Sequence, residues 1–169
     1  MVLEIISDMR SSDHIVLFGP PGVGKSTVAR SLAKYGYYCY EGDDDLLPEV
    51  RELNRHNKGL TEELREKQNE LIIQRISRLI RLHPKLVVAY DFMWDRHRRK
   101  LVKLCPDMRW ILLTANRDLL IKRIDRPGHL ITPEFALLII NMFEKPTIAY
   151  KEITNDGSVE DTTAKIISR

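Results

Sequence analysis

The residues of this sequence with the clearest chemical potential form a glycine-rich segment that ends in a lysine and two hydroxyl residues. They fit the pattern G-x-x-x-x-G-K-[ST], with an apolar run before and a helical pattern after, which is the setting in which this pattern binds phosphate. The glycines let the backbone curl so that successive N–H groups point at a β-phosphate, where the following helix adds its positive field. We therefore predict an ATP and Mg²⁺ site in which the lysine bridges the β- and γ-phosphates and the first hydroxyl binds the metal ion. The segment consists of Gly19, Pro20, Pro21, Gly22, Val23, Gly24, Lys25, Ser26 and Thr27.

An acidic turn, Glu41-Gly42-Asp43-Asp44-Asp45, follows the second predicted strand. If that strand neighbours the first, one of these carboxylates can accept the proton of an attacking hydroxyl and orient it in line with the γ-phosphate. Three adjacent acids also suit a helix N-terminus or an exposed loop. We predict that Asp43 or Asp44, ahead of Asp45, acts as the base, and that Asp44 also contacts the acceptor.

Asp91 comes directly after the apolar run 86–90. A hydrophobic run that ends in aspartate is typical of the acid that holds Mg²⁺ through water in P-loop proteins. The same pattern also occurs for structural reasons alone. We predict that Ser26 and Asp91 contact the metal ion.

The basic run 95–100 follows shortly after Asp91. Near a site at the strand ends, its arginines could hold an anionic or polyhydroxyl acceptor through charge-assisted hydrogen bonds. A solvated helix face is the alternative for most of the run. We predict an acceptor-binding role for Arg96 or Arg99, and we interpret the preceding Trp94 as a packing residue that could also line the pocket.

The segment from Arg123 to His129 separates two predicted helices, which is where a mobile cover is expected. Arginines on such a cover reach the transferring phosphoryl group only when it closes, and they neutralise charge while water is excluded. We predict this role for Arg126, together with Arg123, on a lid of about residues 123–133. His129 is interpreted as a hinge or packing residue.

Short apolar runs rich in β-branched and aromatic residues alternate with helical patterns along the chain. Several runs are continuously apolar, as expected of parallel strands covered on both faces. The alternation predicts an α/β fold whose ligands gather at the carboxyl ends of the strands. The predicted strands are 14–18, 37–41, 85–90, 108–114 and 148–153, and the predicted helices are 25–35, 61–83, 95–104, 117–125, 133–144 and 158–169.

The composition is that of one compact domain: 169 residues, 43% hydrophobic and 30% charged. Residues 1–12 lack the apolar run and cleavage site of a signal peptide, and no later stretch is long and apolar enough for a membrane span. Cys39 and Cys105 lack metal-ligand spacing, which argues against zinc and suits a reducing compartment. The net charge of +3 favours anionic partners without requiring nucleic acid. We expect a cytoplasmic monomer or homodimer with no membrane partner.

Taken together, these motifs give the chain a resemblance to the gluconokinase and shikimate kinase group of small P-loop kinases, within the nucleoside-monophosphate-kinase-like fold. Residues 126–130 resemble the R-x-G-H-F segment of gluconokinases, and residues 142–146 resemble the later helix end with its E-x-P. Residues 42–48 are similar to the G-D-x-x-H-P turn, and residues 96–101 to the Y-R-D-x-L-R stretch.

This resemblance implies a single three-layer P-loop NTPase domain with a five-stranded parallel sheet in the order 2-3-1-4-5, a short lid and an acceptor-binding region at about 43–83. It also implies ATP as the phosphoryl donor and a hydroxyl of a sugar acid or other carbohydrate-like small molecule as the acceptor.

The chain departs from the gluconokinase pattern on the acceptor side. Leu47 stands where the family has the histidine of His-Pro, and residues 90–95 are bulkier and more acidic than the family's C-S-A-L-K-R. The glycine-rich turn of shikimate kinases is also missing at this point. Two other functions therefore stay open: a nucleoside, nucleotide or polynucleotide 5′-kinase, and a nucleotide-binding regulatory module without transfer activity.

Overall fold

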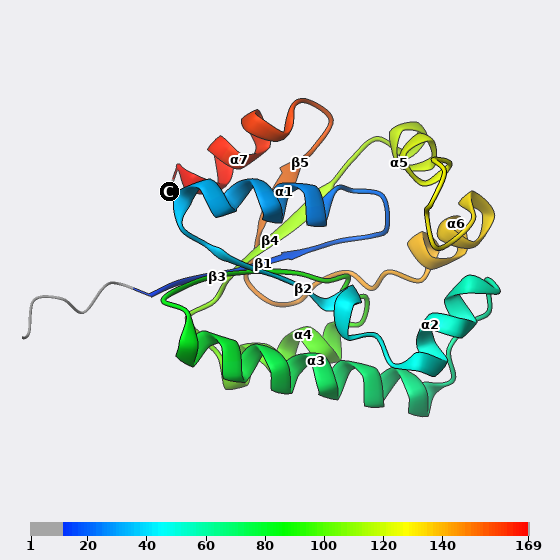
Figure 1. Ribbon diagram of the computed structural model, residues 1–169, viewed down its shortest axis with the longest axis horizontal. Helices are drawn as coiled ribbons and strands as arrows, with labels where there is room; N and C mark the ends of the chain where they lie inside the picture. The colour runs from blue at the N-terminus through cyan, green and yellow to red at the C-terminus, as the bar shows by residue number, and fades with distance from the viewer. Residues whose placement is uncertain (1–11, 169) are drawn as a thin grey trace, which may run out of the picture.

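The computed structural model describes residues 12–168 and is built around a five-stranded parallel sheet (Figure 1). The strands lie in the order β2-β3-β1-β4-β5, and each neighbouring pair is parallel. The predicted α/β class and strand order are therefore confirmed. The strands are β1 (Asp13–Phe18), β2 (Tyr38–Glu41), β3 (Lys85–Ala89), β4 (Arg109–Thr114) and β5 (Lys151–Thr154).

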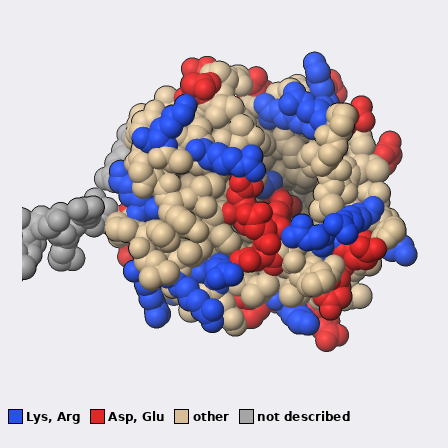
Figure 2. All heavy atoms as spheres, viewed as in Figure 1, with Lys and Arg blue, Asp and Glu red and all other residues tan. Residues whose placement is uncertain are grey.

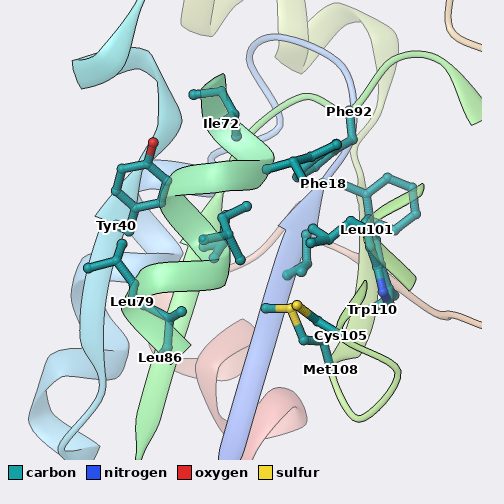
Figure 3. Close-up of a cluster of buried hydrophobic side chains, with 14 of the residues drawn as sticks. Phe18, Tyr40, Ile72, Leu79, Leu86, Phe92, Leu101, Cys105, Met108 and Trp110 are labelled. Carbon is teal, nitrogen blue, oxygen red and sulfur yellow. The ribbon is translucent and has the colours of Figure 1, made fainter. Parts of the chain in front are cut away.

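Helices cover both faces of this sheet, as Figure 1 shows. One face carries α1 (Lys25–Ser31) and α7 (Val159–Ile167), and the other carries α3 (Glu62–Leu82) and α4 (Asp95–Leu104). The side chains of β1 alternate between the two cores, so that Ile15 and Leu17 pack on the α1 side while Val16 and Phe18 pack on the α3 side. Figure 3 shows Phe18 in this second core with Ile72 of α3 and Leu101 of α4. Burial on both faces explains the continuously apolar strands.

The remaining helices gather at the carboxyl ends of the strands. These are α2 (Pro48–Arg55), α5 (Arg117–Ile124) and α6 (Pro133–Asn141), which lie on the side of the molecule where the β1–α1 loop is found (Figure 1). Thr132 caps α6, because its side chain accepts a hydrogen bond from the amide of Phe135 at 3.4 Å. The helices thus enclose the end of the sheet at which ligands were predicted to bind.

Several elements differ from the predicted ones. The predicted helix 25–35 is α-helical only to Ser31 and continues as a 3₁₀ turn (Leu32–Tyr35), and the predicted helix 133–144 ends at Asn141. Strand β5 begins at Lys151 rather than at residue 148 because its pairing with β4 starts there. Helix α2 was not predicted, since only Val50 of its residues is buried and its apolar pattern is short. Another 3₁₀ turn (Gly42–Asp45) carries the acidic residues. The interpretation of the N-terminal segment up to residue 11, and the helix end predicted at Arg169, lie outside the described residues.

Within residues 12–168, none of the helices has the length and apolar character needed to cross a membrane. Both cysteines, Cys39 and Cys105, carry free thiols. In the same part of the chain, no three or more His, Cys, Asp and Glu side chains are grouped so that they could hold a metal ion.

Candidate functional site

The glycine-rich loop between β1 and α1 curls around a space at the start of the helix. Gly22 and Gly24 have φ values of 82° and 90°, which side chains with a Cβ rarely adopt. Among the hydrogen bonds of residues 12–168, none is donated by the amides of Gly22, Val23, Gly24 or Lys25. These amides are therefore available to a polyphosphate, as the sequence pattern requires.

The carbonyl groups of the same loop are held by residues from the far end of the chain. Asn155, buried just after β5, donates its Nδ2 to the Val23 carbonyl at 2.7 Å. Arg123, at the end of α5, donates to the carbonyls of Gly22 and Val23 at 3.4 Å and to that of Asn155 at 2.8 Å. These contacts fix the loop's carbonyls and leave its amides free. Asn155 was not predicted, because a lone asparagine after a strand carries no signal in the sequence.

Lys25 lies at the mouth of the loop. Its Nζ donates to the carbonyls of Gly19 and Pro20 at 2.9 and 3.0 Å and pairs with Asp91 at 2.6 Å. The side chain is only 11% exposed, so the ammonium group is held by these three oxygens. Phosphate oxygens could replace the same contacts. The structure thus brings together Lys25 and Asp91, which the sequence had placed after two different strands.

Two cavities meet at the acidic turn. The first, of about 550 Å³, has the glycine-rich loop on one side and Arg126 and His129 on the other. The second, of about 520 Å³, lies between α2, α3, the residues after β3, and α6. Asp43 and Asp91 line both cavities. A phosphoryl donor in the first and an acceptor in the second would therefore meet at these carboxylates.

The first cavity opens on the face drawn in Figure 2. Beside the β1–α1 loop the surface is hollowed, with Lys and Arg side chains around the hollow and a patch of Asp and Glu next to it. Opposite charges at one opening suit a ligand that carries both phosphates and a bound cation.

Comparison with known proteins extends this description. Residues 15–88 match the family described as ATPase family associated with various cellular activities (AAA), and no curated protein sequence matches the chain significantly. Among solved structures, the chain is similar to a gluconokinase from Sinorhizobium meliloti 1021, with a TM-score of 0.79, 22% identity, and coverage of 94% of this chain and 91% of that one. It is also similar to a sugar kinase from Janibacter sp. HTCC2649, with a TM-score of 0.81, 19% identity and coverage of 93% of both chains. A tunicamycin resistance protein from Deinococcus radiodurans has a TM-score of 0.56 at 19% identity, with coverage of 92% of this chain and 96% of that one.

The chain has the fold of a small P-loop kinase. The AAA match spans β1 to β3 and includes the glycine-rich loop, while the structural likeness to the gluconokinase covers 94% of the chain. At identities of 19–22%, these similarities show that the fold is shared, and the identity of the acceptor has to be inferred from the site itself.

Asp43 is the acid of this P-loop kinase fold that faces the meeting point of the cavities. Its side chain is exposed toward the two cavities, and the protein around it still partly desolvates the carboxylate. This desolvation, together with the nearby charge of Asp91, raises the pKa of Asp43 to about 6, against a smaller opposing effect of Lys25. A carboxylate with such a pKa is suited to take up a proton near neutral pH.

The other two acids of the turn have different surroundings. Asp44 is exposed and lines neither cavity. Asp45 accepts hydrogen bonds from Arg75 Nε and the Tyr40 hydroxyl, both at 2.9 Å, and the Arg75 contact lowers its pKa. The sequence could not choose between Asp43 and Asp44 as the base. In the structure, Asp43 is the one of the three aspartates that borders both cavities.

The predicted acceptor arginines lie outside both cavity linings. Arg96 pairs with Glu62 and Glu66 of α3, and Arg99 is 63% exposed and lies 3.5 Å from Asp95. Arg96 is turned toward acids of α3 and Arg99 toward an acid one turn earlier in α4, so the structure does not bring them to the acceptor side. Arg65 of α3 lies there instead, with its guanidinium 3.8 Å from the centre of the Trp94 ring. The sequence did not single out Arg65, because it sits among many charged residues of a long amphipathic helix.

The predicted lid, residues 123–133, places its two arginines differently. Arg126 is exposed and lines the first cavity, whereas Arg123 is bound to carbonyls of the glycine-rich loop. His129 also borders this cavity, and burial, followed by the charge of Lys25, lowers its pKa. Arg126 is therefore the lid arginine with a side chain free to approach a bound phosphate.

One member of the basic run is buried and structural. Arg98 has no exposed surface, and its NH1 donates to the Phe92 carbonyl at 2.6 Å while its NH2 donates to the Glu144 carbonyl at 2.8 Å. Phe92 has a φ of 43°, which is unusual for a residue with a side chain. Arg98 thus fixes the strained turn that carries Met93 and Trp94 into the second cavity.

Proposed function

We propose that the protein is an ATP-dependent kinase that transfers the γ-phosphoryl group to a hydroxyl of a small molecule. The observation that carries this proposal is the pair of cavities that meet at Asp43 and Asp91, one of them bounded by the free amides of the glycine-rich loop. A nucleotide switch needs only the first cavity. A second cavity that shares a carboxylate of raised pKa with the first is expected of an enzyme that brings two substrates together.

In this proposal the amides of residues 22–25 and the Lys25 ammonium hold the β- and γ-phosphates. Asp43 accepts the proton of the acceptor hydroxyl while the hydroxyl oxygen bonds to the γ-phosphorus. The bond from that phosphorus to the bridging oxygen of ADP breaks in the same step. Arg126 neutralises the charge that spreads over the transferring group.

The donor set at the loop also fits Mg²⁺ brought with ATP. The Ser26 hydroxyl and the Asp91 carboxylate line the same cavity and offer the oxygen atoms that this ion prefers. The ion would neutralise phosphate charge when bound, and Ser26 and Asp91 would orient it.

The acceptor class suggested by the sequence resemblance is a sugar acid or another carbohydrate-like molecule. A thermal-shift screen of sugar acids, sugars, other hydroxy acids and nucleosides, with an unhydrolysable ATP analogue present, should reveal the class, because a ligand of the native state raises the melting temperature. Mass spectrometry with ATP should then detect the phosphorylated product. Tight ATP binding with no phosphorylated product from any ligand that raises the melting temperature would count against the kinase proposal.

The base assignment is tested with neighbouring variants. Asp43→Asn should lower kcat with the identified acceptor by about 10²-fold or more, because general base catalysis typically contributes this much. Asp44→Asn is the matched control and should stay close to wild type, since Asp44 lines neither cavity. Wild-type rates for both variants would overturn the assignment.

A further inference from the structure

The second cavity has a chemical character that a polyhydroxyl acceptor does not explain. Its walls are mainly apolar and come from α2, α6, the loop before α3 and the turn after β3. The apolar side chains on these walls are Leu46, Val50, Leu60, Phe92, Met93, Phe135, Leu138, Ile139 and Met142.

Three of the five amide side chains that line this cavity are already engaged with the protein. Gln68 accepts from the Leu47 amide at 2.7 Å and donates to the Asp45 carbonyl at 3.2 Å. Asn69 donates to the Arg65 carbonyl at 2.9 Å, and Asn57 accepts from the Thr132 amide at 2.9 Å. Asn54 and Asn141 remain for a ligand, but along the apolar walls a chain of several hydroxyls would lose its water with no polar group to replace it, which is unfavourable.

Two side chains of α6 support an apolar ligand directly. Leu138 is 59% exposed and Met142 is 48% exposed, although both line the cavity. Large apolar side chains that stay exposed at the wall of a cavity are typical of a surface that an apolar ligand covers.

Two cationic side chains, Lys58 and Arg65, line the cavity, and Arg65 has an unused donor that is buried. Arg65 is 14% exposed and stacks on Trp94, and its NH1 and NH2 groups bind Glu62 and the Leu60 carbonyl. Its Nε is buried and has no hydrogen-bond partner among the described residues. A buried guanidinium N–H without a partner is costly, and a small shift of the side chain would let it bind a carboxylate.

We propose that the acceptor is an amphipathic hydroxy acid: a hydroxyl beside Asp43, an apolar body such as an alicyclic ring against Leu138 and Met142, and a carboxylate at Arg65. This inference rests on the proposed kinase function and specifies its acceptor. It differs from the carbohydrate-like acceptor that the resemblance implies, and the bulky residues 90–95 are the part of the sequence that departs from the gluconokinase pattern.

Three matched probes test the inference by calorimetric titration with an unhydrolysable ATP analogue bound. They are trans-4-(hydroxymethyl)cyclohexanecarboxylate, its neutral relative (4-methylcyclohexyl)methanol, and gluconate, which keeps a primary alcohol and a carboxylate on a polyhydroxyl body. The cyclic acid should bind about tenfold more tightly than the neutral alcohol, because the alcohol lacks the charged group. It should also bind about tenfold more tightly than gluconate, because the gluconate hydroxyls would be left without partners.

Protein variants then locate the contacts. Leu138→Gln should weaken the cyclic acid by about three- to tenfold, whereas Leu104→Gln, at a residue that is 57% exposed and lines neither cavity, should not. Arg65→Met should weaken the acid and leave the neutral alcohol unchanged, with unaltered binding of the ATP analogue as evidence that the variant is folded.

The outcomes separate this inference from the kinase proposal. Tighter binding of gluconate, no binding of any probe while the nucleotide binds, or no effect of Leu138→Gln would each overturn the amphipathic acceptor. Binding of the cyclic acid in the predicted order, but without phosphorylated product when ATP is supplied, would support the character of the cavity and argue against the kinase.

Discussion

At the scale of single residues, the position of Asp43 beside both cavities decides what the acidic turn can do. Asp44 and Asp45 have the same side chain, yet one faces solvent and the other is bound by Arg75 and Tyr40. The sequence could place a carboxylate after the second strand, because strand ends in a parallel sheet meet at one edge. It could not choose among the three, since a change of one residue turns the side chain to a different environment.

The raised pKa of Asp43 gives a stability prediction. The folded state raises this pKa from 3.8 to about 6, so it disfavours the ionised form, and the resulting cost to stability grows as the pH rises from about 4 and levels off above about 7. Asp43→Asn should therefore raise the melting temperature by a few degrees at pH 8 and by less at pH 5. Differential scanning calorimetry across this range measures the effect.

The control for this stability prediction is Asp44→Asn, which changes the same net charge one residue along the chain. An equal rise in melting temperature in both variants, independent of pH, would assign the effect to overall charge and contradict the local explanation.

Lys25 gives the second residue-scale prediction. Lys25→Met removes the ammonium group that the structure holds at the mouth of the loop, together with its charge-assisted contacts to phosphate. ATP affinity should fall by about ten- to a hundredfold, as expected for hydrogen bonds to charged groups. Lys34→Met, also in the stretch that follows the loop but lining neither cavity, is the control. Unchanged binding of a labelled ATP analogue by Lys25→Met would contradict the phosphate site.

At the scale of elements, the glycine-rich loop depends on β5 and α7, which come last in the chain. Asn155 donates to the loop and accepts from Thr162 at 2.7 Å, so one buried amide joins three elements. The motif itself was readable because glycine spacing and a strand-to-helix setting are local properties. Its anchors were not, because contacts over this separation arise only when the sheet forms.

Asn155→Ala should lower the free energy of unfolding by about 1–3 kcal/mol, because it leaves the Thr162 hydroxyl without its partner and the Val23 carbonyl with only the longer contact from Arg123. ATP affinity should also fall, since the loop loses a support. Thr154→Ala, at the exposed end of β5, is the control and should change neither quantity appreciably. Urea unfolding and nucleotide titration measure the two effects. A stability loss with unchanged affinity would show that Asn155 supports the fold without positioning the loop.

Arg98 and Arg99 form a second element-scale comparison. Arg98→Met should cost about 3–5 kcal/mol, because it leaves the carbonyls of Phe92 and Glu144 without their buried donor and removes one of the two cations near Asp95. Arg99→Met, at a residue 63% exposed, should change stability by less than about 0.5 kcal/mol. Urea unfolding of both variants measures the difference, and equal effects would contradict the buried role of Arg98. Two adjacent arginines look alike in sequence, so only the packing of α4 distinguishes them.

At the scale of the whole molecule, one continuous segment, residues 126–142, borders both cavities. The residues around Arg126 border the first cavity, and α6 walls the second. This segment is tied to distant parts: the Thr132 amide donates to Asn57 at 2.9 Å, and the Asp95 amide donates to Glu144 at 2.7 Å. The sequence predicted the sheet and the break between α5 and α6, because strand alternation and a helix break are visible locally, and the role of that break as a lid stays a prediction. The shared cover depends on contacts between residues far apart in the chain and emerged only from the structure.

This arrangement predicts that Arg126 affects transfer more than nucleotide binding. Arg126 is exposed and bordered by cavity space, so Arg126→Ala should bind ATP within about threefold of wild type, while the single-turnover rate with the identified acceptor falls by about 10²- to 10³-fold, as for removal of one donor to developing charge. Arg117→Ala, at the opposite end of α5, should change neither value. In the proposed cycle the arginine reaches the phosphoryl group when the segment closes over both ligands, so its contribution belongs to the transition state. Equal losses in ATP affinity and in rate would instead place Arg126 in nucleotide binding and contradict a role confined to the transfer step.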